Sequence, residues 1–347
     1  MKKLSVLLLF AAALFVSCEQ QDQPFSQGKA VTFSATSKVG TKTAYSGKVL
    51  DGKEAILWEN NDVITVWCNQ ATVYGGTQKY ADYKISTTDG VTAKVTPVSA
   101  GVELLWGEDE THKFYASYGA KSLAASYVTA TISATQTVKE SGSNVFVPVL
   151  SDNGVMVAAA EANPSDGSVS LTFKPIFTTL QFTVSSGVED DVEITGFSLK
   201  VNEGSKATLC GNFSATLSTT KDPVISVPAT AGQEISVAFG TSGKVTLKKD
   251  ETLTFSVIAL PTELTDLVAV FTVNAQEISV PLKKDGAFIR FAAGKKSRIT
   301  ALGVLKPEEP TSDPVGINVD VEDQGVDDYD MNDTGNTGGD DPGNGGN

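Results

Sequence analysis

Apolar and polar residues alternate along much of this chain. Several segments alternate strictly and are rich in β-branched and aromatic residues, a pattern typical of half-buried strands. No segment shows helical periodicity over ten or more residues, and residues 158–162 would form at most one or two helical turns. The sequence therefore predicts an all-β fold. The clearest alternating segments are 31–35, 63–67, 169–173, 180–184 and 253–257.

Turn sequences rich in Gly, Asn and Asp separate these segments. Short strands at such spacing are typical of β-sandwiches. The turn-rich stretch at residues 163–167 is the best candidate boundary, because it leaves about 140 residues on each side, a common domain size. We therefore predict an N-terminal β-sandwich domain over residues 29–165 and a C-terminal one over residues 166–306.

The first residues have the features of an export signal. Two lysines precede an apolar run over residues 4–16, which is too short to span a bilayer as a helix but suits a secretory signal. The run ends at Ser17 and Cys18, which resembles a bacterial lipoprotein signal. This resemblance implies removal of residues 1–17, acylation of Cys18 with palmitate or a similar chain, and anchoring in outer-membrane lipid through a tether over residues 18–28. An ordinary signal peptide with an incidental cysteine is the alternative.

The formal net charge of −14 belongs mostly to the C-terminal tail. Residues 308–347 include 12 acidic residues and no basic one, whereas residues 19–307 include 29 acidic and 25 basic residues. An acidic chain without a basic patch is a poor nucleic-acid binder. The tail over residues 307–347 is expected to be disordered, because Asp, Asn and Gly dominate it. One tail segment, residues 315–321, nevertheless alternates as a strand does, and its apolar members are Val315, Ile317, Val319 and Val321.

Candidate chemistry is scarce. His112 is the only histidine, which disfavours a His-rich metal site or a catalytic triad. The carboxylate clusters at residues 108–110 and 189–191 fall in predicted loops and are expected to be solvated, with His112 at the surface beside the first cluster. Residues 328–333 lack the glycine and glutamate of a calcium loop. Cys68 and Cys210 are expected to be small buried residues without a disulfide. The sequence thus predicts no enzyme, no cofactor and no metal site.

Several segments resemble the fimbrillin family of pilin-like surface lipoproteins, in order from about residue 31 to residue 305. Residues 41–45 and 56–64 resemble the family's T-R-T segment and its W-x-x-x-D-x-I strand entry. Residues 114–118 and 132–137 resemble its aromatic-small-Tyr strand and its A-x-Q turn. Residues 173–182 and 291–299 resemble the start of its second domain and its last strand.

The residues in these motifs suggest packing, not catalysis. Trp58, Trp67 and Phe182 are expected to fill a sandwich core, because large aromatic side chains bury much apolar surface. Asp62 is expected to cap a turn.

The resemblance implies two tandem Greek-key (transthyretin-like) β-sandwich domains and a non-catalytic stalk or anchor subunit of a fimbrium, or a related adhesin with a host or microbial ligand. Such a subunit is located on the cell outer membrane or in the fimbrium, and its partners are other fimbrial subunits in a homo- or heteropolymer. In the family, a protease cuts after the first strand, here about residues 30–36, and removal of that strand opens a groove. The C-terminal strand of another subunit then fills the groove by β-augmentation. The donor here would be residues 315–321.

The cleavage site departs from the family pattern. The family's protease is typically specific for arginine, yet the only arginines are Arg290 and Arg298. Cleavage would therefore use Lys38, Lys42 or Lys48, or a different protease. Without cleavage the lipid would stay attached, as in an anchor subunit.

Two alternatives stay open. Residues 315–321 could pair as an edge strand of their own domain or stay disordered. The chain could also be a glycan-binding surface lipoprotein that serves polysaccharide uptake, with Trp106, Tyr115 and Tyr118 as the candidate sugar-stacking cluster. Core packing is the competing interpretation of those aromatic residues.

Overall fold

The computed structural model describes nine segments of the chain. Its side chains are described over most of these residues. The segments are residues 28–37, 44–50, 53–73, 76–202, 205–228, 230–265, 267–282, 289–306 and 318–323.

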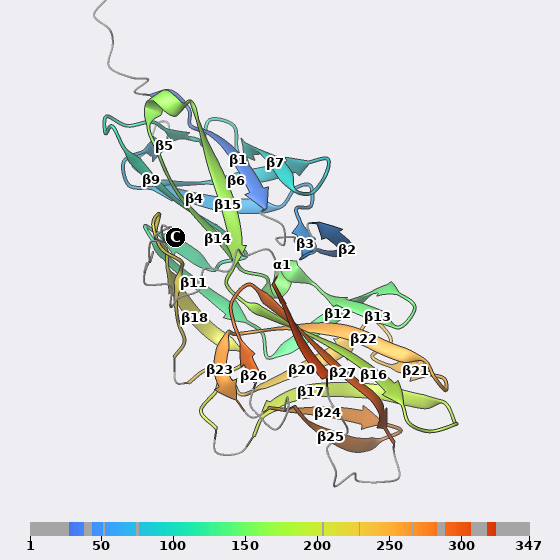
Figure 1. Ribbon diagram of the computed structural model, residues 1–347. Coiled ribbons are helices and arrows are strands. Elements are labelled where there is room, and N and C mark those ends of the chain that lie inside the picture. The colour runs from blue at the N-terminus through green and yellow to red at the C-terminus, as the bar shows by residue number, and fades with distance from the viewer. Residues whose placement is uncertain are drawn as a thin grey trace, which may run out of the picture.

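The described chain is almost entirely β-structure, which confirms the all-β prediction (Figure 1). Its helical elements are the single turn α1 (Leu150–Asn153) and the 3-10 turn η1 (Pro164–Asp166). Within the described residues, no helix has the length and apolar character needed to cross a membrane.

Seven strands of the N-terminal half close into a barrel in the order β1-β15-β14-β9-β4-β6-β7, at the top of Figure 1. Their inward residues alternate with outward ones, as along β6, and the inward set includes Phe33, Phe114 and Phe173. The strand bounds are β1 (Thr32–Ser37), β4 (Val63–Cys68), β6 (Tyr80–Thr87), β7 (Thr92–Pro97), β9 (His112–Tyr118), β14 (Met156–Ala162) and β15 (Ser168–Pro175).

An eleven-stranded sheet forms most of the rest of the molecule. Its order is β25-β24-β17-β20-β12-β13-β22-β16-β27-β28, and β21 pairs with β17 beside this path. Buried phenylalanines pack together in its core, for example Phe182 on Phe255 with ring centroids 5.2 Å apart. The bounds are β12 (Thr135–Gly142), β13 (Val145–Pro148), β16 (Thr178–Ser186), β17 (Val192–Val201), β20 (Glu234–Phe239), β21 (Val245–Leu247), β22 (Thr252–Ala259), β24 (Leu267–Val273), β25 (Gln276–Leu282), β27 (Lys295–Leu305) and β28 (Asn318–Asp323).

Four smaller sheets complete the described structure. The largest has the order β10-β11-β18-β19 and consists of β10 (Ser122–Ala124), β11 (Tyr127–Ile132), β18 (Gly211–Thr216) and β19 (Val224–Ser226). The others pair two strands each: β2 (Ala44–Leu50) with β3 (Lys53–Leu57), β5 (Thr72–Val73) with β8 (Leu104–Leu105), and β23 (Thr262–Thr265) with β26 (Ile289–Phe291).

The strand pairings cross the boundary expected at residues 163–167. β15 follows that turn in sequence, yet it belongs to the barrel, where it pairs with β1 and β14. β12 and β13 precede the turn, yet they pair with β20 and β22 in the larger sheet. The turn itself is as predicted, because Asp166 caps it by accepting the Asn163 N–H at 2.7 Å. The sheets are therefore not divided between residues 165 and 166.

One side chain fastens the crossing strand β12 to the larger sheet. Gln136 is buried, and its amide group bonds both backbone groups of Ile258 in β22: Nε2 donates to the carbonyl at 2.6 Å and Oε1 accepts the N–H at 3.0 Å. This glutamine belongs to the A-x-Q motif noted in the sequence. The motif residue thus satisfies two buried backbone groups that would otherwise lack partners.

The expected packing roles hold with one exception. Trp58 and Phe182 are buried, and Asp62 caps a turn by accepting the Glu59 N–H at 2.8 Å. Residues 158–162 form part of β14, which lies between β9 and β15 in the barrel. Trp67 departs from expectation, since its side chain is only partly buried and lies on the outer face of the barrel.

Candidate functional site

The first strand, β1, is inserted between β7 and β15 in the barrel (Figure 1). It runs parallel to β15, from Thr32 opposite Ser168 to Ser37 opposite Phe173, and antiparallel to β7. A strand with two neighbours uses the hydrogen-bonding groups of both its edges. Removal of β1 would therefore expose one edge of β7 and one of β15.

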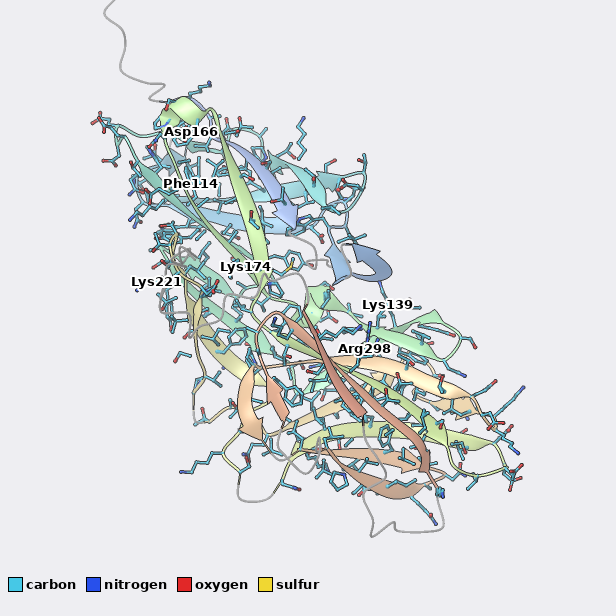
Figure 2. All side chains as sticks on the ribbon, viewed as in Figure 1. Phe114, Lys139, Asp166, Lys174, Lys221 and Arg298 are labelled. Carbon is cyan, nitrogen blue, oxygen red and sulfur yellow. The ribbon has the colours of Figure 1, made fainter. Side chains whose placement is uncertain are left out.

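The inward face of β1 fills part of the barrel core. Val31, Phe33 and Ala35 are buried, whereas Thr32 between them is exposed. The Phe33 ring makes edge-to-face contacts with Tyr83 at 5.0 Å and Phe114 at 5.4 Å between centroids. Phe114 lies within the barrel in Figure 2. Removal of β1 would therefore leave a groove bordered by Tyr83 and Phe114.

A second contact, which the sequence did not reveal, holds the chain just before β1. The backbone of residues 28–31 pairs with residues 104–106: Gly28 N–H donates to the Trp106 carbonyl at 3.2 Å, and Trp106 N–H donates to the Lys29 carbonyl at 3.0 Å. Val31 N–H donates to the Leu104 carbonyl at 2.8 Å. The segment that would have to leave with β1 therefore starts at residue 28 or earlier.

The predicted modification sites lie mostly outside the described residues. Cys18, Lys38 and Lys42 are among the residues not described. Lys48 lies in β2, of which the backbone alone is described. β1 ends at Ser37, and Lys38 is the residue that follows it in the sequence. Acylation at Cys18 and cleavage at these lysines stay predictions.

The last described strand, β28, includes part of the expected donor segment. Val315 and Ile317 lie outside the described residues, whereas Val319 and Val321 fall in β28. β28 pairs antiparallel with β27 at the end of the larger sheet. For residues 318–321 this is the edge-strand arrangement considered as an alternative above. The donor role stays a prediction.

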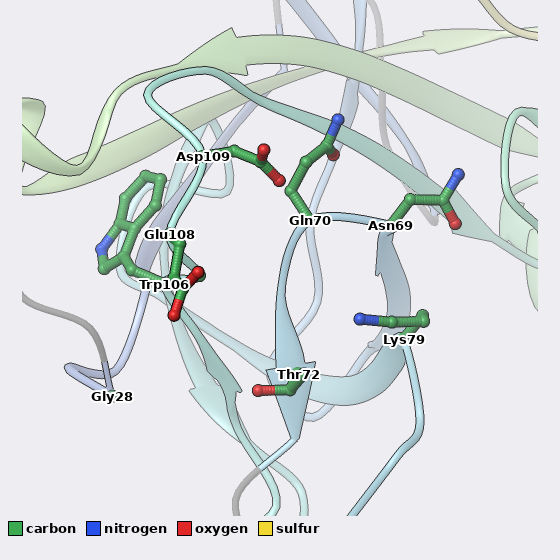
Figure 3. A pocket seen from close by; sticks show the side chains of 9 residues that line it. Gly28, Asn69, Gln70, Thr72, Lys79, Trp106, Glu108 and Asp109 are labelled. Carbon is green, nitrogen blue, oxygen red and sulfur yellow. The ribbon is translucent and has the colours of Figure 1, made fainter.

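A polar cavity of about 460 Å³ lies where the described chain begins (Figure 3). Its lining contains acidic, basic and amide side chains, and Lys79 Nζ donates to the Ala71 carbonyl at 2.9 Å. The lining includes no histidine, cysteine or serine, and the described residues hold no cluster of three or more His, Cys, Asp or Glu suited to a metal ion. This lining gives no support for nucleophilic or metal catalysis. The lining residues are Gly28, Asn69, Gln70, Thr72, Lys79, Trp106, Gly107, Glu108 and Asp109.

His112 is buried, which corrects the prediction that it is a surface residue. As the first residue of β9 it points inward, where its ring packs edge-to-face on Trp106 with centroids 4.9 Å apart. Its Nε2 accepts the Gly107 N–H at 3.0 Å. Burial lowers the pKa of His112, and the nearby Asp109 carboxylate opposes this effect only in part. The carboxylates at residues 108–110 are exposed, as predicted.

Two of the three residues of the predicted aromatic cluster are buried, and a different aromatic row is partly exposed. Trp106 and Tyr118 are buried in the core. Trp67, expected in the core, instead stacks on Tyr80 at the barrel surface with centroids 5.6 Å apart, and Tyr115 is its direct neighbour on β9. The strict alternation along β4 predicts this orientation, because Val66 and Cys68 on either side of Trp67 are buried. Residues 67, 80 and 115 thus form a row on three adjacent strands.

Both described cysteines are buried and free, as predicted. Burial raises the pKa of the Cys68 thiol to about 11 and also raises that of Cys210. A thiol with a raised pKa is a poor nucleophile near neutral pH. Neither cysteine offers reactive chemistry.

Taken together, the described residues form a strand-built structural protein, in which the first strand fills a barrel groove and the last strand lies on a sheet edge. The sequence profile of the fimbrillin-like family matches residues 27–317, and the chain belongs to this family. It is accordingly a structural protein and not an enzyme. Family membership implies a location at the cell surface or in a fimbria, and association with other fimbrial subunits.

Solved structures share the fold. A protein from Bacteroides uniformis with a suggested role in cell adhesion is 18% identical with a TM-score of 0.52, and the match covers 85% of this chain and 98% of that one. A protein from Bacteroides ovatus described in the same way is 13% identical with a TM-score of 0.53, covering 87% of this chain and 99% of that one. At these identities the likeness shows the fold alone. A comparison with curated proteins gave no match.

Proposed function

We propose that this chain is a lipid-anchored stalk or anchor subunit of a fimbrium that assembles by strand exchange. The observation that carries the proposal is the insertion of β1 between β7 and β15, with Phe33 in the barrel core. After loss of β1, the vacant groove would offer two unpaired strand edges and an apolar floor. An extended strand from another subunit would satisfy both, through backbone hydrogen bonds and side-chain pockets.

The proposed donor matches the groove in its pattern. The inward residues of β1 and the residue before it recur at every second position, Val31, Phe33 and Ala35. Val315, Ile317, Val319 and Val321 recur with the same period, so one face of the donor is apolar over a similar length.

Anchoring and maturation supply the remaining steps of the proposal. Cys18 is the lipid attachment point at the outer membrane, and cleavage at Lys38, Lys42 or Lys48 would free β1 together with the lipid. An uncleaved chain would keep both and act as an anchor. The first test is mass spectrometry of the protein from native outer membranes. A mature start at acylated Cys18 supports an anchor, and a start between residues 38 and 49 supports a polymerising stalk. An unmodified Cys18 at or near the mature start contradicts lipid anchoring.

Assembly is tested separately with two truncations. A chain ending at Pro310 lacks the donor, whereas a chain ending at Gly325 keeps residues 315–321 and loses six of the twelve acidic residues of the tail. The proposal expects high-mass polymers from the longer chain and none from the shorter one. Unchanged polymer formation by the chain ending at Pro310 would overturn strand donation by this segment.

The aromatic row at residues 67, 80 and 115 favours glycan binding as a second candidate function. Tyr80 is 40% exposed, and exposed aromatic rings stack on the apolar faces of sugars. Retardation of the protein in native gels containing xylan, starch or mucin measures such binding. Trp67→Ala should abolish retardation, whereas Val224→Ala, at another exposed apolar position, should not. Equal mobility of wild type and Trp67→Ala in every gel would exclude the row as a binding site for these glycans.

A further inference from the structure

The polar cavity adjoins the aromatic row at residues 67, 80 and 115. Asn69 lines the cavity and follows Trp67 by two residues, so their Cα atoms lie no more than about 7 Å apart. The two side chains are in contact, because Trp67 Nε1 donates to Asn69 Oδ1 at 2.8 Å. Lys79, which also lines the cavity, directly precedes Tyr80. The row and the cavity are therefore neighbouring parts of one surface.

The turn after β4 and the loop before β9 form walls of the polar cavity. Cys68 N–H donates to the Lys79 carbonyl at 2.8 Å, which joins the end of β4 to the start of β6. Gln70 Oε1 accepts the Lys113 N–H at 3.3 Å, which joins the turn to β9. A Cβ on Gly107 would overlap the Gln70 carbonyl oxygen, so glycine is needed for the loop to pack this closely on the turn. Contacts within the barrel therefore fix the shape of the cavity.

The lining of the polar cavity offers both donors and acceptors of hydrogen bonds. In Figure 3, the side chains of Thr72, Lys79 and Glu108 point toward the space between the turn and the loop. A ligand hydroxyl both donates and accepts, so it can pair with an ammonium group, an amide or a carboxylate. Neutral ligands that carry many hydroxyl groups therefore suit this lining.

The charges of the lining disfavour an anionic ligand. Two carboxylates, those of Glu108 and Asp109, outnumber the one ammonium group, that of Lys79. Lys79 Nζ also donates to the Ala71 carbonyl at 2.9 Å, which uses part of its hydrogen-bonding capacity. Like charges placed against each other are costly in recognition, so a ligand carboxylate would be rejected here.

We propose that the polar cavity and the aromatic row form one binding site for a neutral glycan. The row stacks on one sugar ring, and the cavity holds the hydroxyl groups of the adjoining sugar. The volume of about 460 Å³ lies within the range of about 300–1,000 Å³ that is usual for small-molecule sites. This inference rests on the second candidate function, glycan binding by the row, and adds to it the cavity and the selection for uncharged sugars.

An array of immobilised oligosaccharides tests the selection by charge. The array should contain matched pairs, in which one member is neutral and the other has a uronic or sialic acid at one end. The purified full-length protein should bind neutral members, and the acidic partner of each bound member about tenfold more weakly. Equal or stronger binding of the acidic partners would overturn selection for neutral glycans.

Two double variants test the contribution of the cavity. Glu108→Gln with Asp109→Asn should weaken binding of neutral glycans about tenfold, because hydrogen bonds to charged acceptors are the stronger ones. The same variant should discriminate less against the acidic partners, a change that loss of fold would not produce. The control, Glu110→Gln with Glu140→Gln, removes the same charge at exposed positions outside the lining and should bind as the wild type does. Equal effects of the two double variants would overturn the role of the cavity.

Variants of the row separate this inference from the second candidate function. Trp67→Ala should abolish binding, and Tyr80→Ala, at the most exposed member of the row, repeats the test with less effect on packing. Binding that needs the row but is unchanged by Glu108→Gln with Asp109→Asn would overturn the cavity subsite and leave the row as a glycan site. Binding that needs the cavity but neither Trp67 nor Tyr80 would overturn the shared site.

A lack of binding to every member of the array would overturn both the shared site and glycan binding by the row. The fimbrial role is measured separately, by polymer formation of the two truncated chains, and does not depend on this outcome.

Discussion

Strand β1 lies between two neighbours in a closed barrel, whereas β28 lies at the end of an open sheet and pairs with β27 alone. β1 brings Phe33 into the barrel core, where it contacts two other aromatic rings. β28 instead pairs with its one neighbour from Asn318 opposite Thr300 to Asp323 opposite Lys295. The first strand is therefore part of a domain core, whereas the second strand adds to the edge of a sheet. Loss of the first should therefore be far more costly than loss of the second.

The largest expected effect comes from the core side chain of β1. Phe33→Ala should lower the free energy of unfolding by about 3–5 kcal/mol, because it leaves a cavity between Tyr83 and Phe114. Thr32→Ala, on the exposed face of the same strand, should change it by about 0.5 kcal/mol or less. Urea unfolding of both variants measures the difference. Similar losses for the two variants would show that β1 does not contribute to the core through this face.

The next effect concerns Gln136, whose side chain attaches β12 to β22. Gln136→Ala should cost about 2–6 kcal/mol, because it leaves the buried N–H and carbonyl of Ile258 without partners, at roughly 1–3 kcal/mol each. Ser133→Ala nearby loses only exposed hydrogen bonds and should cost about 1 kcal/mol or less. Thermal and urea unfolding would reveal the contrast. A loss of stability for Gln136→Ala no larger than that for Ser133→Ala would show that these hydrogen bonds of Gln136 do not hold β12 on β22.

A smaller effect is expected when the pH is lowered, and it comes from His112 in the barrel. Because burial lowers the pKa of His112, the unfolded chain binds a proton more readily than the folded one. Stability from this group is therefore complete above the ordinary histidine pKa, about 6.5, and is lost as the pH falls below it. Urea midpoints at pH 7 and pH 5 should fall more for the wild type than for His112→Gln. Equal losses on acidification would assign the acid response to other groups.

The smallest effect is expected at the edge strand. Asp320→Asn with Glu322→Gln neutralises the residues that lie opposite Arg298 and Lys296 in the register, and a cross-strand pair of opposite charge contributes about 0.2–1 kcal/mol. Because β28 has one strand neighbour, the urea midpoint of the global transition should hardly change. A loss comparable to that of Phe33→Ala would show that β28 is integral to the sheet, and the contrast with β1 would then disappear.

Much of the local structure could be predicted from the sequence. Alternation over residues 31–35, 169–173 and 253–257 corresponds to β1, β15 and β22, because side-chain period is a local property of a strand. The turn at residues 163–167 and the cap at Asp62 were predictable for the same reason. Pairing partners were not, since β1 joins β15 across more than 130 residues and both edges of a strand look alike in sequence.

The positions of single polar and aromatic residues were likewise predictable only in part. His112 was expected at the surface because acidic residues precede it, yet its place at the start of β9 turns it inward. Trp67 was expected in the core because it is large, yet alternation in β4 turns it outward. In both cases the alternation along the strand, and not the type of residue, decided which way the side chain points. The apolar residues close to each position show this alternation in the sequence.

The sequence by itself determined that this chain forms alternating strands, that its body is nearly neutral, and that its acidic tail keeps one strand-like segment. Those properties depend on neighbouring residues along the chain. Only the tertiary structure decided that β15 belongs to the barrel, that β12 and β13 cross to the larger sheet, and that β28 pairs with β27. Long-range pairing depends on which edges and faces remain to be covered once all strands are present, and no local pattern encodes that.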